Sequence, residues 1–177
     1  RPMISQKIDL AIRQVPNFPK PGINFKDITP LFLDSGLSCE IVDAFIERLQ
    51  GQKVDAIVGI ESRGFLFGFL LANRMGIPFV LIRKVGKLPG ETLKYKYDLE
   101  YGSAEVEVHK SDIQKDWNIV IHDDLLATGG TACAAAALIQ QLDAKVVGFA
   151  FVVSLDFLNG KEKLIQYSDN IISLKDY

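Results

Sequence analysis

Short apolar runs alternate along this chain with longer segments in which apolar residues recur every three or four positions. Apolar runs of this kind are typical of buried strands, and the wider spacing is typical of amphipathic helices. The runs predict strands at residues 54–60, 78–82, 118–124 and 145–153, and the spaced segments predict helices at residues 38–50, 64–75 and 132–142. Because strands that alternate with helices favour a parallel sheet, we expect an α/β fold with a central, mostly parallel sheet flanked by helices.

The N-terminal part of the chain shows a separate pattern. Apolar residues recur at helical spacing from about Met3 to Gln14, which predicts a first helix. Pro16, Pro19 and Pro21 cannot continue that helix, and they hold the next segment extended. Ser38 is the expected N-cap of the second helix.

Residues 83–102 interrupt the alternation of strands and helices. They carry Gly and Pro at several positions, four lysines and little apolar periodicity. A long segment of this kind in a compact domain is usually a functional loop or disordered. Its lysines favour a lid loop, at about residues 84–102, that closes over a polyanion; a solvated hairpin is the alternative. Residues 104–108 alternate and predict the strand that follows it.

The most informative stretch runs from Asn118 to Thr131. The predicted strand ends at Asp123 and Asp124, a turn of small residues follows, and a helical pattern begins after the turn. Free backbone N–H groups and the helix dipole attract an anion to such a helix N-terminus. Glycines let the backbone approach a ligand, and threonines add hydroxyl donors. We therefore interpret the turn as a phosphate cradle made of Ala127, Thr128, Gly129, Gly130 and Thr131.

The two carboxylates need a partner other than phosphate, which they would repel. Ionised aspartate only accepts hydrogen bonds, so vicinal hydroxyls on a ribose are its natural partners. The predicted ligand is a ribose 5-phosphate, and an ordinary strand-to-helix turn with an acidic start is the alternative. The glycines of Gly59–Gly64 do not form a P-loop, because Phe65 stands where the lysine must be.

Composition narrows the class of protein. The 177 residues include 20 Lys and Arg against 22 Asp and Glu. The chain therefore has no surplus of basic residues that would indicate a nucleic-acid partner. Cys39 and Cys133 have no C-x-x-C spacing, which predicts neither a disulfide framework nor a zinc site and favours a reducing compartment. No apolar run reaches membrane-spanning length and no signal peptide is recognised, so we expect a cytoplasmic protein without a membrane partner. Residues 1–177 are expected to form a single domain.

Four stretches together resemble a known family. Residues 120–131 resemble the signature of the type I phosphoribosyltransferases, which bind 5-phosphoribosyl-1-pyrophosphate. Residues 18–30, residues 61–68, and residues 83–90 leading into 97–102 are similar to the adenine-specific members of that family. The matches fall in the same order and cover most of the chain.

The resemblance implies a reaction and most of its binding residues. It implies that adenine displaces pyrophosphate from 5-phosphoribosyl-1-pyrophosphate to give AMP, as in purine salvage. The 5-phosphate would bind at residues 127–131 and the ribose hydroxyls at Asp123 and Asp124. Mg²⁺ would be the cofactor, held mainly by substrate and water and not by a cage of protein ligands. The residues implied for pyrophosphate are Ser62, Arg63, Arg83, Lys84 and Lys87.

The base is implied to bind in an N-terminal segment of about residues 1–33. Adenine would lie between Phe25 and Leu125, with backbone groups near Asn24 and Lys26 reading its Watson–Crick edge. Family members usually carry an apolar residue at the position of Asn24 and arginine at that of Lys26, so the implied readout there is by the backbone.

The catalytic carboxylate of the family's loop matches Glu100, and Tyr101 is its expected loop partner. The lysine that matches Lys87 reaches into the neighbouring subunit's site in the family, which implies a homodimer. The bond that matches Glu61–Ser62 tends to be cis there. His122 stands where the family has an apolar residue, and we interpret it as a strand histidine hydrogen-bonded to a neighbour, with a ligand or base role as the alternative.

Two other functions compete with this one. The first is a phosphoribosyltransferase for a 6-oxopurine or for orotate. The second is a non-catalytic regulator that senses the sugar pyrophosphate. Regulators of that kind add a DNA-binding module, and no helix-turn-helix or basic stripe is recognised in this sequence.

Overall fold

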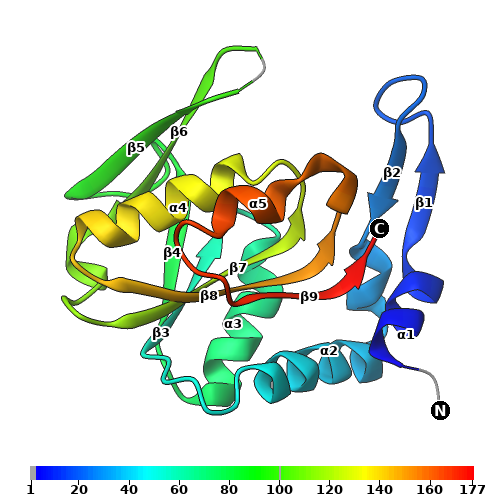
Figure 1. The fold of residues 1–177 in the computed structure, drawn as a ribbon, viewed down its shortest axis with the longest axis horizontal. Coiled ribbons are helices and arrows are strands. Elements are labelled where there is room, and N and C mark those ends of the chain that lie inside the picture. The colour runs from blue at the N-terminus through cyan, green and yellow to red at the C-terminus, as the bar shows by residue number, and fades with distance from the viewer. Residues whose placement is uncertain (1–2, 100) are drawn as a thin grey trace.

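The computed structural model describes residues 3–99 and 101–177. Its centre is a seven-stranded sheet with the strand order β5-β6-β4-β3-β7-β8-β9 (Figure 1). The parallel strands are β3 (Ala56–Ile60), β4 (Phe79–Lys84), β7 (Asn118–Leu126), β8 (Lys145–Ser154) and β9 (Ile171–Asp176). The antiparallel edge consists of β5 (Thr92–Asp98) and β6 (Ser103–His109). The predicted α/β class is confirmed.

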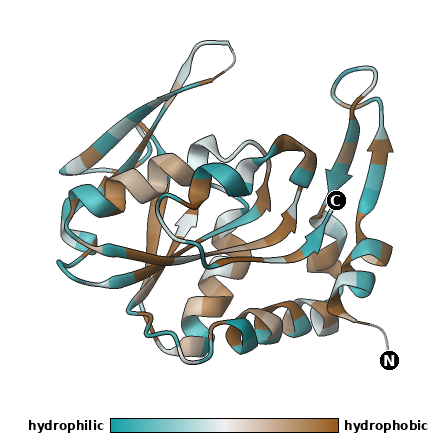
Figure 2. Ribbon diagram, viewed as in Figure 1, coloured by the Kyte–Doolittle hydropathy of each residue, from teal (hydrophilic) through white to brown (hydrophobic). Residues whose placement is uncertain are grey.

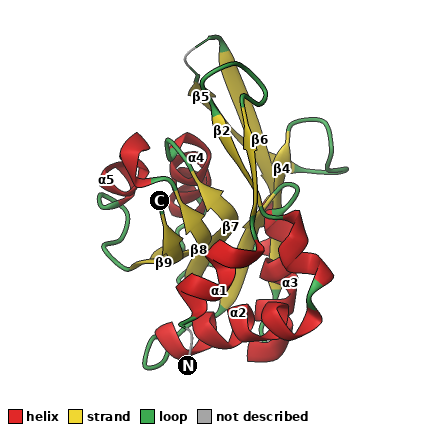
Figure 3. Cartoon of the chain, turned by 90° about the vertical axis from the view of Figure 1, so that its right-hand side faces the viewer, coloured by secondary structure: helices red, strands yellow, loops and turns green. Residues whose placement is uncertain are grey.

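Helices cover both faces of the sheet (Figure 3). One face carries α1 (Ile4–Ala11), α2 (Ser35–Arg48) and α3 (Gly64–Met75), and the other carries α4 (Gly130–Gln141) and α5 (Gly160–Leu164). Short 3-10 helices occupy Thr29–Leu33, Lys110–Asp112 and Asp156–Leu158. No helix in the described part of the chain is long and apolar enough to cross a membrane.

Strand β7 holds the two layers together. Ile119 and Ile121 belong to the apolar cluster under α4, whereas Val120 belongs to the cluster under α2 and α3. Successive side chains of a strand point to opposite faces, so a strand buried on both faces is apolar throughout. The central strands are accordingly mainly hydrophobic, while β5 and β6 mix hydrophobic and hydrophilic residues (Figure 2).

The connectivity locates a crevice at one edge of the sheet. From β3 the chain passes through α3 to β4 on one side, and from β7 it passes through α4 to β8 on the other side. Ligands of open α/β sheets bind outside the carboxyl ends of the strands at the point where the strand order reverses in this way. That point lies between β3 and β7, beside the stretch with the acidic pair.

The N-terminal helix is shorter than predicted. It ends at Ala11, and Arg13–Pro16 forms strand β1, which pairs antiparallel with β2 (Asn24–Asp27). The helical spacing continues past Ala11, but backbone pairing with a segment further along the chain overrides it. The N-cap of α2 is Asp34, whose carboxylate accepts a hydrogen bond from Leu37 N at 3.0 Å, and not the predicted Ser38.

The prediction of a loop throughout residues 84–102 is wrong for its middle part. Strand β5 pairs with β6 over seven residues, so the segment is largely a hairpin. Its side chains alternate: Leu93, Tyr95 and Tyr97 pack against the cluster under α4, and Lys94 and Lys96 are exposed. The two hairpins, β1–β2 and β5–β6, project from the same side of the sheet at opposite ends of the molecule (Figure 1).

Candidate active site

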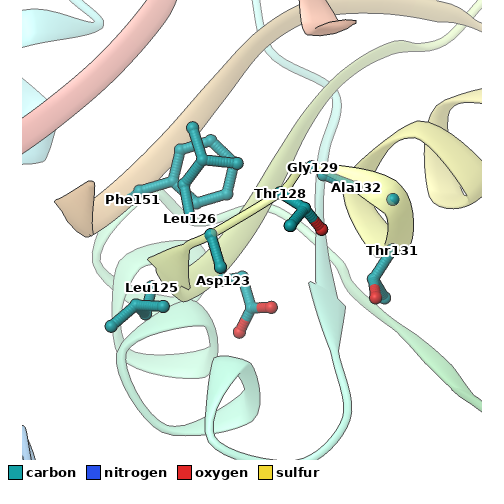
Figure 4. Close-up of a pocket in the computed structure, with 10 residues that line it drawn as sticks. Asp123, Leu125, Leu126, Thr128, Gly129, Thr131, Ala132 and Phe151 are labelled. Atoms are coloured by element: carbon teal, nitrogen blue, oxygen red, sulfur yellow. The ribbon is translucent and has the colours of Figure 1, made fainter. Parts of the chain in front are cut away.

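The predicted phosphate cradle joins β7 to α4. Gly129 has a left-handed backbone (φ 89°), and α4 begins at the next residue. The loop borders a pocket in which the oxygen atoms of Asp123, Thr128 and Thr131 face the same space (Figure 4). The residues that line this pocket are Asp123, Leu125, Leu126, Ala127, Thr128, Gly129, Gly130, Thr131, Ala132 and Phe151. The structure thus brings all five predicted cradle residues together with Asp123.

A second glycine supports the loop from behind. A Cβ atom at Gly160 would lie 2.5 Å from the carbonyl oxygen of Ala127, and a Cβ at Gly129 would lie 3.0 Å from the carbonyl oxygen of Gly160. The start of α5 therefore packs directly on the backbone of the cradle. Gly160 was not predicted as a site residue, because the Asn-Gly pair at 159–160 indicates only a turn.

The two side chains of the acidic pair point to opposite faces of β7. Asp123 lines the pocket, and its Oδ1 accepts a hydrogen bond from Asp124 N at 2.8 Å. Asp124 is buried, and its Oδ2 lies 3.0 Å from Nε of Arg63, the residue that precedes α3. Burial raises the pKa of Asp123 well above its ordinary value, and the negative charge of Asp124 adds to this effect. Hydroxyl donors from a ligand would favour the ionised form of Asp123.

Arg83 also has a carboxylate partner. Its Nε lies 2.9 Å from Oε1 of Glu61, which accepts a second hydrogen bond from Lys84 N at 3.1 Å. Burial acts to raise the pKa of Glu61, but these two hydrogen bonds and the charges of Arg83 and Lys87 outweigh it, so the pKa is lowered. The Glu61–Ser62 peptide bond is cis, as the resemblance implies. Of the five residues implied for pyrophosphate, Ser62 and Arg63 follow β3, and Arg83 and Lys84 end the neighbouring strand β4. Lys87 lies in the turn after β4.

The β1–β2 hairpin holds the residues implied for the base. The side chains of Asn24 and Lys26 both donate to Oε1 of Gln14, at 3.0 and 2.8 Å, and so lie on one face of the hairpin. Phe25 packs edge-on against Phe18, with ring centroids 5.2 Å apart. The two polar side chains are therefore engaged within the hairpin, which leaves the backbone of β2 as the group able to read a base edge.

The two predicted walls of the base pocket belong to different parts of the molecule. Leu125 packs against the cluster under α2 and α3, whereas Phe25 packs within the hairpin. Asp27, at the end of β2, accepts hydrogen bonds from Arg13 on β1 and from Thr29. Hydrogen bonds from Thr29 lower the pKa of Asp27, and the charge of Arg63 contributes in the same direction.

Comparison with known proteins identifies the family. The family model of the phosphoribosyl transferase domain matches residues 33–174. The adenine phosphoribosyltransferase of Koribacter versatilis is 47% identical over 166 residues, which cover 94% of this chain and 90% of the relative. The chain belongs to the adenine phosphoribosyltransferase family.

Solved structures of adenine phosphoribosyltransferases share the fold over nearly the whole chain. The enzyme of Thermoanaerobacter pseudethanolicus is 47% identical, with a TM-score of 0.92 and coverage of 97% of this chain and 98% of that one. The enzyme of Saccharomyces cerevisiae is 46% identical, with a TM-score of 0.91 and the same coverage, and was crystallised with an imino-altritol bisphosphate and adenine. The fold implied by the resemblance is confirmed.

His122 is a structural residue in this member of the adenine phosphoribosyltransferase family. Its ring is fully buried, and Nδ1 lies 2.8 Å from the carbonyl oxygen of Ala150 on β8. Burial lowers the pKa of His122 to about 4, so the ring is neutral at pH 7 and Nδ1 donates to the carbonyl. The interpretation of His122 as a hydrogen-bonded strand histidine is confirmed.

The predicted catalytic group of the adenine phosphoribosyltransferase fold, Glu100, lies outside the described residues. Its expected loop partner Tyr101 is 85% exposed and follows β5 near the end of the hairpin. Within residues 3–99 and 101–177, no group of His, Cys, Asp and Glu side chains is arranged to hold a metal ion.

Proposed function

We propose that this protein transfers the 5-phosphoribosyl group from 5-phosphoribosyl-1-pyrophosphate to adenine, which gives AMP and pyrophosphate. The observation that carries the proposal is the pocket in which a phosphate cradle at a helix N-terminus adjoins the carboxylate of Asp123. A phosphate and a vicinal diol are the two ends of a ribose 5-phosphate, and they match the two parts of this pocket. Family membership over nearly the full length supports adenine as the acceptor. We expect the reaction to take place in the cytoplasm, because the two cysteines show no disulfide pattern.

The proposed mechanism requires three tasks of the chain. Residues 127–131 bind the 5-phosphate, and Asp123 and Asp124 accept hydrogen bonds from the ribose hydroxyls. Ser62, Arg63, Arg83, Lys84 and Lys87 surround the pyrophosphate. The C1′–O bond breaks with its electron pair on pyrophosphate, the N9–C1′ bond forms, and the purine loses one proton. Glu100 is the group proposed to accept or stabilise that proton.

The carboxylates at this edge are paired with arginines, which fits a magnesium ion that is carried by the substrate and not by protein ligands. Glu61 and Asp124 are already engaged with Arg83 and Arg63, so they do not form a free oxygen cage. Mg²⁺ keeps several waters and is commonly bound through substrate phosphates. When bound, it would neutralise charge on the departing pyrophosphate.

One experiment decides between the competing functions. The protein is incubated with the sugar pyrophosphate, Mg²⁺ and adenine, hypoxanthine, guanine or orotate in turn, and the nucleotide formed is identified. AMP alone supports the proposal. A nucleotide of another base supports a different phosphoribosyltransferase, and binding of the sugar pyrophosphate without any product supports a regulator.

Replacing either carboxylate of the acidic pair should weaken use of the sugar pyrophosphate. Asp123→Asn and Asp124→Asn keep the shape but remove the charge that strengthens a hydrogen bond to a ribose hydroxyl. Such a bond is worth roughly 1.5–3 kcal/mol, so we expect kcat/KM for the sugar pyrophosphate to fall roughly 10- to 150-fold in each variant. Binding of adenine to the free protein, measured by calorimetry, should change little. Unaltered kinetics in both variants would mean that the ribose binds elsewhere.

An exposed apolar surface supports a homodimer as part of the proposal. Leu66, Phe69 and Leu70 on α3 are each about half exposed, and together with Phe65, Phe79 and Leu81 they line a shallow groove. Exposed apolar patches of this kind mark interaction sites. The groove adjoins the substrate side of the sheet, because the guanidinium of Arg83 lies 5.8 Å from the ring centre of Phe65. A second copy of the chain is the proposed occupant.

Mixed dimers test whether Lys87 serves the neighbouring site. Within its own subunit, the charge of Lys87 contributes to the lowered pKa of Glu61. If it nevertheless acts in the partner's site, mixing Lys87→Ala with Asp124→Asn subunits should restore one intact site in each mixed dimer. We expect activity to recover to a substantial fraction of the wild-type value after subunit exchange. No recovery, with mixed dimers demonstrated by native mass spectrometry, would assign Lys87 to its own subunit's site or to none.

A further inference from the structure

The β5–β6 hairpin reaches the phosphate cradle through one tyrosine. The hydroxyl of Tyr97 on β5 lies 3.0 Å from Oγ1 of Thr131, in the first turn of α4. The tyrosine ring lies beside the preceding residue of the cradle, since a Cβ atom at Gly130 would be 3.6 Å from the Cδ2 of Tyr97. Within the described residues, this is the one side-chain hydrogen bond between the hairpin and the cradle.

The outer end of the hairpin is held by side chains that face α4. Strand β6 pairs with β4 at Arg83–Glu107 and Lys84–Val106, and Val85 N donates to the carbonyl oxygen of Glu105 at 3.2 Å. Tyr97 pairs with Ala104, the position just beyond these contacts, and from there to the tip β5 and β6 pair only with each other. The side chains that face α4, of which Tyr97 is the outermost, therefore hold this end of the hairpin to the body of the protein.

A bound phosphate would set the direction of this hydrogen bond. In the free protein either hydroxyl can donate to the other. A phosphate oxygen only accepts, so Thr131 must turn its single O–H toward the ligand. Tyr97 must then donate to Thr131, which completes a chain from Tyr97 through Thr131 to the phosphate. Hydrogen bonds in such a chain strengthen one another.

We propose that Tyr97 is a positioning residue that couples occupancy of the phosphate cradle to the position of the β5–β6 hairpin. The inference rests on the proposed function for the identity of the ligand, a 5-phosphorylated ribose. Phosphate binding strengthens the contact of Tyr97 with Thr131 and so holds the outer end of the hairpin against α4. Tyr97 acts through Thr131 and does not itself contact the substrate.

Hydrogen exchange of the backbone amides provides the test, with ribose 5-phosphate as the probe. In the wild-type protein, the ligand should slow exchange both in the cradle and in residues 92–98 and 103–109. In Tyr97→Phe, which keeps the ring on Gly130, the cradle should remain protected while the added protection of the hairpin is lost. Tyr95→Phe is the matched control, because Tyr95 lies two positions away on the same face of β5 and packs on the same cluster. It should behave as the wild type.

Steady-state kinetics give a second readout. KM for the sugar pyrophosphate should rise roughly 2- to 10-fold in Tyr97→Phe, the range expected for the loss of one neutral hydrogen bond, and less than about twofold in Tyr95→Phe. Equal hairpin protection in Tyr97→Phe and in the wild type would overturn the proposal, as would an equal loss in both variants or no hairpin protection in the wild type. A wild-type protein that forms no AMP would refute the proposed function alone, because the exchange measurement with ribose 5-phosphate does not depend on turnover.

Discussion

Adenine should be used about 10⁴-fold more efficiently than hypoxanthine, measured as kcat/KM with saturating sugar pyrophosphate. Adenine presents an amino donor and a ring acceptor on its Watson–Crick edge, and hypoxanthine presents the reverse order. Strand β2 has one partner strand, β1, in the described residues, so alternate backbone N–H and C=O groups of β2 point away from it. A backbone pair that matches adenine faces like groups in hypoxanthine, and sites built on hydrogen bonds discriminate by 10⁴-fold or more.

Side-chain variants of the hairpin separate backbone readout from side-chain readout. The side chains of Asn24 and Lys26 both bind Gln14, so Asn24→Ala and Lys26→Ala should leave the ratio of adenine to hypoxanthine use nearly unchanged. A fall of the ratio toward one in either variant would assign the readout to that side chain. Comparable turnover of the two bases by the wild-type protein would reject the assignment of the base to this hairpin.

Glu100→Gln should reduce turnover by about 10²–10⁴-fold, the usual contribution of a general acid or base. The purine carries one proton too many once N9 has attacked C1′, and a carboxylate near N7 can take up or stabilise it. Glutamine keeps the size of the side chain but cannot accept a proton. Binding of both substrates should stay nearly intact. The measurement is a single-turnover rate, in which product release cannot mask the chemical step.

The control for Glu100→Gln should be a glutamate whose side chain is exposed, so that its replacement does not disturb the fold. Glu105, on β6, is exposed, and Glu105→Gln should leave the single-turnover rate within about twofold of the wild type. Glu107 is buried and accepts a hydrogen bond from Gly86 N at 2.5 Å, so its replacement would disturb the turn that carries Lys87. A near-normal rate in Glu100→Gln would show that another group handles the proton.

Local sequence patterns were sufficient to predict the strand, turn and helix at the centre of the candidate site. An apolar run, a turn of small residues and an alanine-rich helix are each local patterns, and α3 was predicted with the bounds Gly64–Met75 that the structure has. The same local patterns predict the cradle at residues 127–131, because a helix N-terminus after a buried strand needs only neighbouring residues to form.

Contacts between side chains far apart in the sequence depend on the folded topology. Arg83 pairs with Glu61 from 22 positions away, and Tyr97 reaches Thr131 across 34 positions. Strands β1 and β5 likewise form by pairing with later segments, which override a helical spacing in one case and Gly- and Pro-rich flanks in the other. Periodicity reports which face of an element is apolar, but the partner of that face is set by chain topology and by the packing of distant segments.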